Sequence, residues 1–323
     1  MSNKRLLIVD GLNMFLRSYI INPTMDPKGE AIGGCIGFLK SLQKCARNYN
    51  PDEIIIAWDG HGGSQKKRTM NKNYKEGRKP VRFNRRMIQL DPEQEVKNKA
   101  YQQLRTMKYL NELPVMQVII DYVEADDVIS YVVQHSKYKD YDKLIVSSDK
   151  DFFQLVNEKT AIFRPIQKKV ITLDVLREDY NIHPNNFALA RAIAGDPSDN
   201  LKGVPRVGLI SVSKKLEGFA DDGQLELEDL LEQCHNIKKP LMLHKNILSN
   251  KDLIENNYKI MQLYKPAISG TNKRIIDYSI NNFEFEYNKM EFTKMLFSDG
   301  QGSLNLSNLF RVCSGISKQA PRA

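Results

Sequence analysis

Short apolar runs alternate with segments of helical periodicity along the first half of the chain. The apolar runs span residues 6–9, 53–58, 115–120 and 144–146, and helical patterns such as residues 33–49 lie between them. Strands that alternate with helices form a mostly parallel sheet. The pattern therefore predicts an α/β fold with a mostly parallel central sheet flanked by helices. A short hairpin or edge element is expected at 164–170 and a helix at 187–194, and helical patterns dominate from 209 to about 264.

Each of the four apolar runs leads to an aspartate at or just after the strand end. These residues are Asp10, Asp59, Asp121 and Asp149. In open parallel sheets, sites lie at the carboxyl ends of the strands, so we expect the four side chains to converge there. One aspartate after a strand is an ordinary turn residue, and only the repetition favours a site.

Two of the strand ends carry more than one carboxyl group. Residues 124–127 read Glu-Ala-Asp-Asp before a helical pattern, and residues 148–151 read Ser-Asp-Lys-Asp. Neighbouring carboxylates raise one another's pKa unless a cation neutralises them, and a divalent metal with oxygen ligands is the commonest remedy. Either turn alone fits a plain helix start equally well, with acids at the positive end of the helix dipole. The four strand ends together favour a metal site.

Composition narrows the class of protein. The 323 residues are 41% hydrophobic and 27% charged, which is typical of a soluble globular chain. No apolar run approaches the roughly 20 residues that span a bilayer. The four cysteines form no CxxC pair and no cluster of zinc spacing, so neither disulfides nor a zinc site is expected. We expect a cytoplasmic protein with an α/β core over residues 1–185 and a helical region over residues 186–323.

The net charge of +9 indicates a polyanionic partner, and much of it gathers in one segment. Residues 66–86 hold ten Lys and Arg side chains against one acid, with Tyr74 and Phe83 among them. A basic run is often a solvated face, and charge alone would also suit an anionic membrane surface. Because this run interrupts an α/β core, it favours an inserted segment that contacts a phosphate backbone and offers an aromatic ring for stacking.

A segment rich in Gly, Pro, Asp and Ser follows the helical pattern of residues 187–194. It spans residues 195–208. These residue types form turns, and glycines also let a loop bring its N–H groups close to a DNA backbone. Further on, residues 306–310 read Leu-Ser-Asn-Leu-Phe, which faintly resembles a motif that docks bacterial replication proteins on a sliding clamp. A core-facing helix is the favoured alternative there, because five-residue motifs recur by chance.

In combination, these motifs resemble the bacterial and phage 5′→3′ exonuclease and flap endonuclease family. That family includes phage RNase H enzymes and the N-terminal nuclease domain of bacterial DNA polymerase I. The similarity covers about residues 5–215. The matching positions are residues 8–11 with Arg17, residues 29–30 with 37–38, Trp58 with Asp59, Tyr74 and Lys75 with Arg78, residues 124–127, residues 148–151, and residues 195–200.

The resemblance implies a PIN-like 5′-nuclease fold that binds two Mg²⁺ ions, with Mn²⁺ as a substitute. Asp10, Asp59, Glu124 and Asp126 would hold the first ion. Asp126, Asp149, Asp151 and Asp199 would hold the second, with Asp127 and Asp196 contributing directly or through water. Lys75 and Arg78 match the family's basic pair at the scissile phosphate and are the expected catalytic residues.

The resemblance also implies a nucleic-acid surface. A helical arch, placed at about residues 60–112, would receive a single-stranded 5′ end, and residues 195–215 resemble a helix-hairpin-helix that grips duplex. Expected contacts are Arg17, Lys66, Lys67, Arg68, Lys72, Tyr74, Arg82, Arg85, Arg86, Gly203, Arg206 and Gly208. Arg206 stands where the family usually has glycine, which argues against the K⁺ ion that the hairpin often binds and adds a cation for phosphate.

The implied activity is metal-dependent hydrolysis at 5′ ends, nicks or flaps of DNA and RNA·DNA duplexes, as in primer removal during replication. Two metals about 4 Å apart activate water and stabilise the developing charges. We expect a monomer without membrane contact, with single-strand-binding protein and a sliding clamp as candidate partners. Two alternatives remain open. A metal-dependent α/β phosphatase or phosphotransferase leaves the basic insertion unexplained, and a non-catalytic nucleic-acid-binding relative leaves the carboxylate set unexplained.

Overall fold

A six-stranded sheet lies at the centre of the computed structural model, which describes residues 3–77 and 90–319. Its strands are β1 (Arg5–Asp10), β2 (Glu53–Asp59), β3 (Met116–Ile120), β4 (Asp142–Val146), β5 (Thr160–Arg164) and β6 (Lys169–Ile171). They lie in the order β3-β2-β1-β4-β5-β6, and every neighbouring pair is parallel except β5 and β6. The mostly parallel sheet predicted from the sequence is confirmed, and the predicted hairpin is the antiparallel β5–β6 edge.

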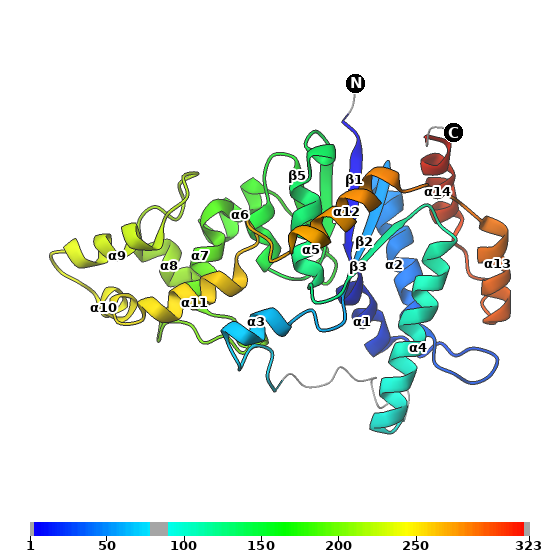
Figure 1. Ribbon diagram of the computed structural model, residues 1–323, viewed down its shortest axis with the longest axis horizontal. Coiled ribbons are helices and arrows are strands. Elements are labelled where there is room, and N and C mark those ends of the chain that lie inside the picture. Colours follow the sequence, from blue (N-terminus) through cyan, green and yellow to red (C-terminus); the bar gives the residue numbers. More distant parts are fainter. Residues whose placement is uncertain (1–2, 78–89, 320–323) are drawn as a thin grey trace.

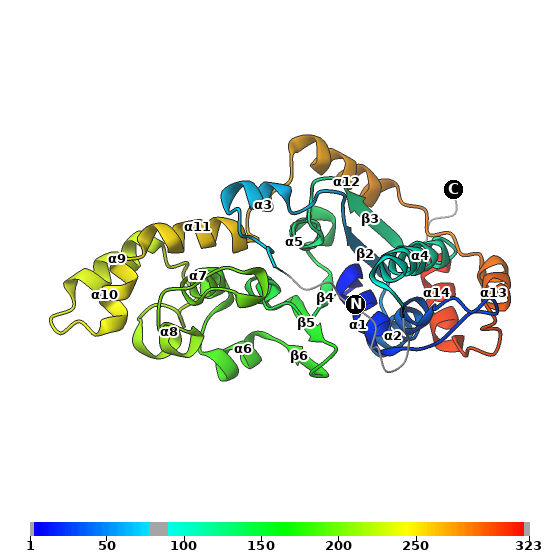
Figure 2. The ribbon, with the colours of Figure 1, turned by 90° about the horizontal axis from the view of Figure 1, so that it is seen from below.

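Helices cover both faces of this sheet (Figure 1). The helices of the described chain are α1 (Gly11–Ile21), α2 (Gly33–Tyr49), α3 (Gln65–Met70), α4 (Pro92–Asn111), α5 (Ala125–Gln134), α6 (Leu173–Tyr180), α7 (Pro184–Ala194), α8 (Leu209–Lys215), α9 (Leu227–Asn236), α10 (Met242–Leu248), α11 (Lys251–Met261), α12 (Gly270–Asn282), α13 (Lys289–Ser298) and α14 (Ser307–Gln319). Of these, α8 to α11 extend away from the sheet to one side (Figure 1). Short 3-10 turns lie at Ser136–Tyr138, Asp151–Leu155 and Pro197–Asp199. Figure 2 shows α5 and α12 on one side of the sheet and α1 and α2 on the other.

The sheet separates two hydrophobic clusters. Successive side chains of a strand point to opposite faces, so Leu6 and Ile8 of β1 pack with α5, α7 and α12, whereas Leu7 and Val9 pack with α1, α2 and α14. Both faces of β1 are buried, which explains its continuous apolar sequence. The helices beyond residue 185 contribute to both clusters. The helical C-terminal region therefore shares its cores with the sheet.

The start of α14 shows what residues 306–310 do. Leu306 and Leu309 are 1% and 0% exposed, within the cluster on the α2 face of the sheet. The Phe310 ring packs edge-on against Phe292 of α13, with ring centroids 5.5 Å apart. The core-facing alternative is confirmed, because Leu306 and Leu309 are buried in the fold and Phe310 is half-buried against it.

Two further expectations concern composition. All four cysteines are buried free thiols, as the sequence predicts. Among the helices that the structure describes, none is long and apolar enough to cross a membrane.

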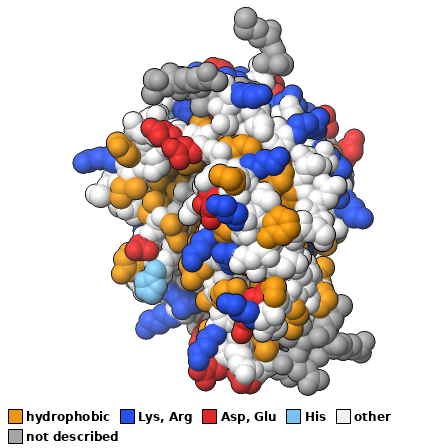
Figure 3. Space-filling view, turned by 90° about the vertical axis from the view of Figure 1, so that its right-hand side faces the viewer, with side chains coloured by type: hydrophobic (Ala, Val, Ile, Leu, Met, Phe, Trp, Pro, Cys, Tyr) orange, Lys and Arg blue, Asp and Glu red, His pale blue; other side chains and the backbone are white. Residues whose placement is uncertain are grey.

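Figure 3 shows the right-hand side of the molecule, where Lys and Arg side chains are interspersed with acidic and hydrophobic ones. The positive charge on that face is thus mixed with charge of the opposite sign.

Local contacts fix the carboxyl ends of β1 and β2 beside the start of α5. The Asp10 carboxylate accepts a hydrogen bond from the Asn13 N–H (3.1 Å) and thereby caps α1. A Cβ atom at Gly11 would lie 2.6 Å from a ring carbon of Trp58, so only glycine lets α1 begin this close to β2. The Ala125 N–H at the start of α5 donates to Asp59 (2.9 Å). The two strand ends and this helix end therefore meet.

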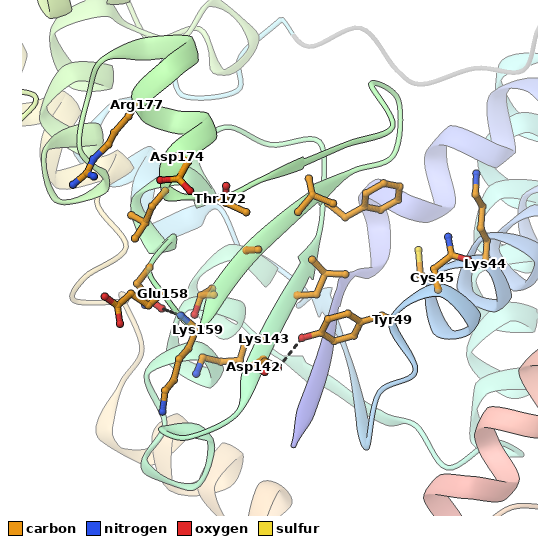
Figure 4. Close-up of a pocket in the computed structure, with 18 residues that line it drawn as sticks. Lys44, Cys45, Tyr49, Asp142, Lys143, Glu158, Lys159, Thr172, Asp174 and Arg177 are labelled. Carbon is orange, nitrogen blue, oxygen red and sulfur yellow. Dashed lines mark hydrogen bonds between the residues drawn. The ribbon is translucent and has the colours of Figure 1, made fainter. Parts of the chain in front are cut away.

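A hollow of about 820 Å³ lies at the opposite, amino ends of the strands (Figure 4). It is bounded by α2 and by the first residues of β4 and β5, including Asp142 and Thr160. The Tyr49 hydroxyl of α2 donates to the Asp142 carbonyl (2.8 Å) across one side of it. None of the carboxylates predicted to bind metal lines this hollow, so it is separate from the candidate site.

Candidate active site

Two of the predicted strand-end aspartates, Asp59 and Asp149, act on a third, Asp10, at the carboxyl edge of the sheet. Asp10 is 7% exposed at the end of β1 and accepts a hydrogen bond from the Ser147 hydroxyl (2.8 Å). Burial raises the pKa of Asp10 to about 7, with further increases from the charges of Asp59 and Asp149 and partial relief from the Ser147 and Asn13 hydrogen bonds. Such mutual repulsion indicates a site where negative charge is concentrated.

Two more carboxyl groups show the same effect. Burial and then the charge of Asp149 raise the pKa of Asp126, in the first turn of α5, well above its usual range. Burial and Asp149 also raise the pKa of Asp151 to about 7, although Arg191 acts in the opposite direction. The acidic turns after β3 and β4 therefore lie side by side, as their positions in the sequence predict.

Glu124 lies next to this group and has its own cations. The Lys67 Nζ is 2.7 Å from one carboxylate oxygen, and the Lys75 Nζ is 2.5 Å from the other. The Tyr74 hydroxyl donates to the same carboxylate (3.2 Å). Burial acts to raise the pKa of Glu124, but the charges of Lys67 and Lys75 outweigh it and lower the pKa to about 2. Glu124 is therefore ionised at neutral pH.

Two predicted nucleic-acid contacts lie in the protein interior instead. Lys67 is 8% exposed and Tyr74 only 2%, the latter packed with Leu201, Ile260 and Met261. A buried carboxylate requires a cation, and Lys67 provides it for Glu124. The predictions of Lys67 as an exposed phosphate contact and of Tyr74 as an open stacking surface are therefore wrong for this structure.

Other predicted basic contacts are accessible or lie outside the described residues. Lys66, Arg68 and Lys72 are exposed on α3 and in the loop after it. Arg17 on α1 is half-buried, and its guanidinium donates to the Ser41 hydroxyl (3.2 Å). The predictions for Arg78, Arg82, Arg85 and Arg86 fall outside the described residues. The described part of the predicted arch consists of residues 60–77 and 90–112, including α3 and α4.

Arg191 links two of the predicted carboxylates and was not predicted itself. Its Nε is 3.0 Å from an oxygen of Asp151, and its Nη2 is 2.5 Å from an oxygen of Asp196. Ser147 is also a new site residue, because its buried hydroxyl donates to Asp10 and accepts from the Asp149 N–H (3.1 Å). The sequence signal for Arg191 is a single charge within the apolar segment 187–194.

Three other acids have different surroundings. Asp127 is 4% exposed and accepts from the Ala267 N–H (2.7 Å), so it attaches α5 to the segment before α12. Asp199 is 9% exposed, and its backbone carbonyl accepts from the Lys75 N–H (2.9 Å). Asp121 is exposed after the edge strand β3, where it lines a separate hollow with Gln65 and Tyr122. The expectation that Asp121 converges with the other strand ends is wrong.

The predicted hairpin connects α7 to α8. The Val207 N–H donates to the Val204 carbonyl (3.1 Å), and Arg206, at the third position of this turn, has a φ of 62°. A positive φ there defines a type II turn and normally requires glycine. A Cβ at Gly203 would lie 2.1 Å from the Ala194 carbonyl oxygen, so this glycine is needed for packing against the end of α7. Gly208 is exposed and immediately precedes α8.

The cluster of acidic side chains described above suits a hard divalent cation by its chemistry. This cluster, called the carboxylate group from here on, consists of Asp10, Asp59, Glu124, Asp126, Asp149 and Asp151. Carboxylate oxygens are the ligands that Mg²⁺ prefers, and a cation would relieve the repulsion that raises these pKa values. In residues 3–77 and 90–319, however, no three acidic, His or Cys side chains have the spacing of a ready-made ion site. Lys67, Lys75 and Arg191 provide the neutralising charge in this arrangement.

Comparison with known proteins places the chain in a family. Residues 5–181 match the family described as 5′-3′ exonuclease, N-terminal resolvase-like domain. A 5′-3′ exonuclease of Buchnera aphidicola subsp. Schizaphis graminum is 32% identical over 221 residues, which cover 68% of this chain and 71% of the relative. A thermostable DNA polymerase I of Thermus thermophilus is 28% identical over 236 residues, which cover 72% of this chain and 26% of the polymerase.

Solved structures share the fold. A bacteriophage T5 D15 flap endonuclease, in a complex with DNA and metal ions, aligns with a TM-score of 0.64 and 20% identity, covering 92% of this chain and 100% of that one. The T5 D15 protein co-crystallized with metal ions gives a TM-score of 0.63 at 18% identity, covering 98% of this chain and 100% of that one. With these matches and the observed α/β architecture, the chain belongs to the 5′-3′ exonuclease family and is a 5′ nuclease.

Proposed function

We propose that this 5′ nuclease hydrolyses phosphodiester bonds at the 5′ ends, nicks and flaps of DNA and RNA·DNA duplexes with the help of two divalent ions, normally Mg²⁺. The observation that carries the proposal is the cluster of carboxylates at the ends of β1 and β4 and the start of α5, where Asp10, Asp126 and Asp151 all have raised pKa values. The ammonium group of Lys75 lies at one side of this cluster, against Glu124 and under the influence of Asp126.

The carboxyl groups divide into two ligand sets in this proposal. Asp10, Asp59, Glu124 and Asp126 would hold one ion, and Asp126, Asp149, Asp151 and Asp199 the other, with Asp127 and Asp196 assisting. Mn²⁺ would substitute for Mg²⁺, since both accept hard oxygen ligands. When bound, the ions would supply an activated water and stabilise charge on the phosphate and the leaving oxygen.

Lys75 is the residue that we propose to act directly on the substrate. Burial acts to lower the pKa of its ammonium group, but the charges of Glu124, Asp126 and Asp199 raise it above its ordinary value, so Lys75 stays protonated. Its Nζ lies 2.5 Å from a carboxylate oxygen of Glu124. A positive charge fixed there can stabilise the negative charge that develops on a scissile phosphate. Arg78 would share this role.

The nucleic-acid surface is proposed to run from the arch, at about 60–112, to the hairpin, at about 195–215. Exposed Lys66, Arg68 and Lys72 lie at the base of the arch, and exposed Arg206 lies on the hairpin. The Pro205 carbonyl of the hairpin accepts a hydrogen bond from the Asn246 side chain (2.9 Å). We propose duplex binding without K⁺, since Arg206 stands where the family usually has glycine. The organisation would be a nuclease core at 1–185 and a helical region at 186–323. We propose that the protein acts as a monomer in the cytoplasm. Single-strand-binding protein is a candidate partner.

The test is product sizing on three 5′-labelled substrates: a flapped DNA, a nicked duplex and an RNA·DNA hybrid. With Mg²⁺, we expect short products released from the 5′ end, and we expect none after chelation. A small phosphomonoester is the control substrate and should remain intact. Hydrolysis of the phosphomonoester without cleavage of the flap would instead support a phosphatase, and DNA binding without any cleavage would support a non-catalytic relative.

A further inference from the structure

The loop that carries Lys75 has a backbone conformation that needs external support. Lys75 has a φ of 56°, in the left-handed region that side chains other than glycine, asparagine and aspartate seldom adopt. Such residues persist only where their surroundings hold them, and they are common at active sites. The contacts of this loop therefore decide where the Lys75 ammonium group lies.

One turn contacts the loop at two points. The Lys75 N–H donates to the Asp199 carbonyl (2.9 Å), and the side-chain amide of Asn200 donates to the Asn73 carbonyl (2.9 Å). Asn200 itself has a φ of 57°, which asparagine tolerates well. Its left-handed conformation lets the Asp199 carbonyl and its own side chain face the same neighbouring loop.

The turn is itself fixed to the body of the protein. Asp196 and Leu201 exchange two backbone hydrogen bonds, both 2.8 Å long, and Leu201 is buried against Tyr74. The side-chain amide of Asn257 on α11 donates to the carbonyls of Ala192 (2.9 Å) and Lys202 (2.8 Å). The turn thus offers a rigid base, and Asn200 is the side chain that reaches from it to the loop that carries Lys75.

We infer that Asn200 is a positioning residue for Lys75: its amide bond to Asn73 holds the loop so that the lysine ammonium group stays at the carboxylate group. This inference rests on the proposed role of Lys75 in cleavage. Asn200 acts through the loop, and it needs no contact with substrate or metal. Loss of the bond should therefore affect the chemical step more than DNA affinity.

The experiment compares Asn200→Asp and Asn200→Gly with a matched control, Asn181→Gly. Both replacements at residue 200 tolerate a positive φ and lack the amide donor, and the glycine variant adds no charge. Asn181 also has a left-handed φ, of 51°, and its amide also donates to a backbone carbonyl, that of Ser213 (3.4 Å), but it ends α6. Single-turnover cleavage, DNA affinity in Ca²⁺ and melting temperature are measured for each.

We expect both changes at residue 200 to lower the single-turnover rate about tenfold, the scale of one lost hydrogen bond, with affinity changed by less than about twofold. Asn181→Gly should leave the rate unchanged. In a Lys75→Ala background, either change at residue 200 should lower the rate by less than about twofold further, because the side chain that it positions is gone.

Two results would overturn the inference while leaving the proposed function intact. One is an unchanged rate for both Asn200 variants in the presence of Lys75. The other is a full tenfold loss in the Lys75→Ala background, which would show that Asn200 acts independently of the lysine. If Lys75→Ala itself retained the parent rate, the proposed role of Lys75 would be wrong, and the inference would fail with it.

Discussion

At the scale of single residues, the site depends on which carboxyl groups have a cationic partner. Glu124 is paired with Lys67 and Lys75, and its pKa is low. Asp10 accepts its hydrogen bonds from neutral donors, the Asn13 N–H and the Ser147 hydroxyl, and its pKa is high. Carboxyl groups such as Asp10, which have no cationic partner, gain most from an added cation, because nothing else neutralises their ionised form.

The sequence shows the acids of the site better than their partners. An aspartate at the end of an apolar run is recognisable because strand ends of a parallel sheet share an edge. The role of Lys67 is not recognisable, because ten basic residues in a run have the same chemistry and only tertiary packing, which places α3 beside α11 and Lys67 against Glu124, decides which one is buried. Tyr74 is enclosed in the same way, by Leu201 and by Ile260 and Met261 of α11.

Asp10→Asn should stabilise the metal-free protein at alkaline pH. The folded-state pKa of Asp10 is about 7, above its usual 3.8, so the folded chain holds a proton that the unfolded chain releases between these values. The stability from this group is complete below about pH 4 and lost as the pH rises through 7. In chelator, we expect this substitution to raise the melting temperature by a few °C at about pH 8 and to give no gain at about pH 4. A lower melting temperature than the parent at about pH 8 would contradict this.

Arg206→Gly should separate backbone strain from phosphate binding. Glycine removes the cost of a side chain at a φ of 62°, about 1 kcal/mol, which offsets the greater entropy of the unfolded chain. We expect the free energy of unfolding to stay the same or rise by up to about 1 kcal/mol, measured by denaturant titration. Duplex binding should weaken, and the slope of log affinity against log salt should fall by about one. Loss of stability together with an unchanged slope would refute both parts.

At the scale of elements, hydrophobic periodicity correctly predicted where helices and strands occur and which of the two each segment forms. The helix expected at residues 33–49 is α2, and the one expected at 187–194 is most of α7. Strand order could not be read from the sequence, because nothing in an apolar run tells which neighbour it pairs with. The structure makes β3 an edge strand, and for that reason Asp121 lies outside the carboxylate group.

The anchor of α4 gives a prediction at this scale. The Arg105 guanidinium makes two bonds to Asp299, of 2.7 and 2.8 Å, and the Tyr109 hydroxyl donates to the same carboxylate (2.8 Å). Asp299 is 6% exposed, so Asp299→Ala leaves Arg105 without its partner and should cost about 3 kcal/mol of unfolding free energy. The matched control is Glu93→Ala on the same helix, which removes the exposed pair with Lys97 and should cost less than about 0.5 kcal/mol. Equal, small losses in denaturant titrations would show that Asp299 does not anchor α4.

At the scale of the whole molecule, the site is where three parts of the chain meet. The sheet supplies the strand ends, α3 and the loop after it supply Lys67 and Lys75, and the turn before the hairpin holds that loop through Asp199 and Asn200. Sequence motifs indicated each part because they lie within residues 5–215. The arrangement of α9 to α14 had no such motif. The apolar faces of α12 and α14 cover opposite sides of the sheet, whereas α9 and α10 pack on each other away from it (Figure 1).

The most direct test of the central claim compares Asp149→Asn with Asp121→Asn. Both aspartates follow strands of one sheet, but only Asp149 belongs to the carboxylate group. The measurement is single-turnover cleavage of a 5′-labelled flap in Mg²⁺, beside DNA affinity in Ca²⁺. We predict that Asp149→Asn loses at least about 10³-fold in rate while retaining affinity within about threefold, and that Asp121→Asn cleaves like the parent. Substantial turnover by Asp149→Asn, or an equal loss in both variants, would contradict the assignment of the active site to these strand ends.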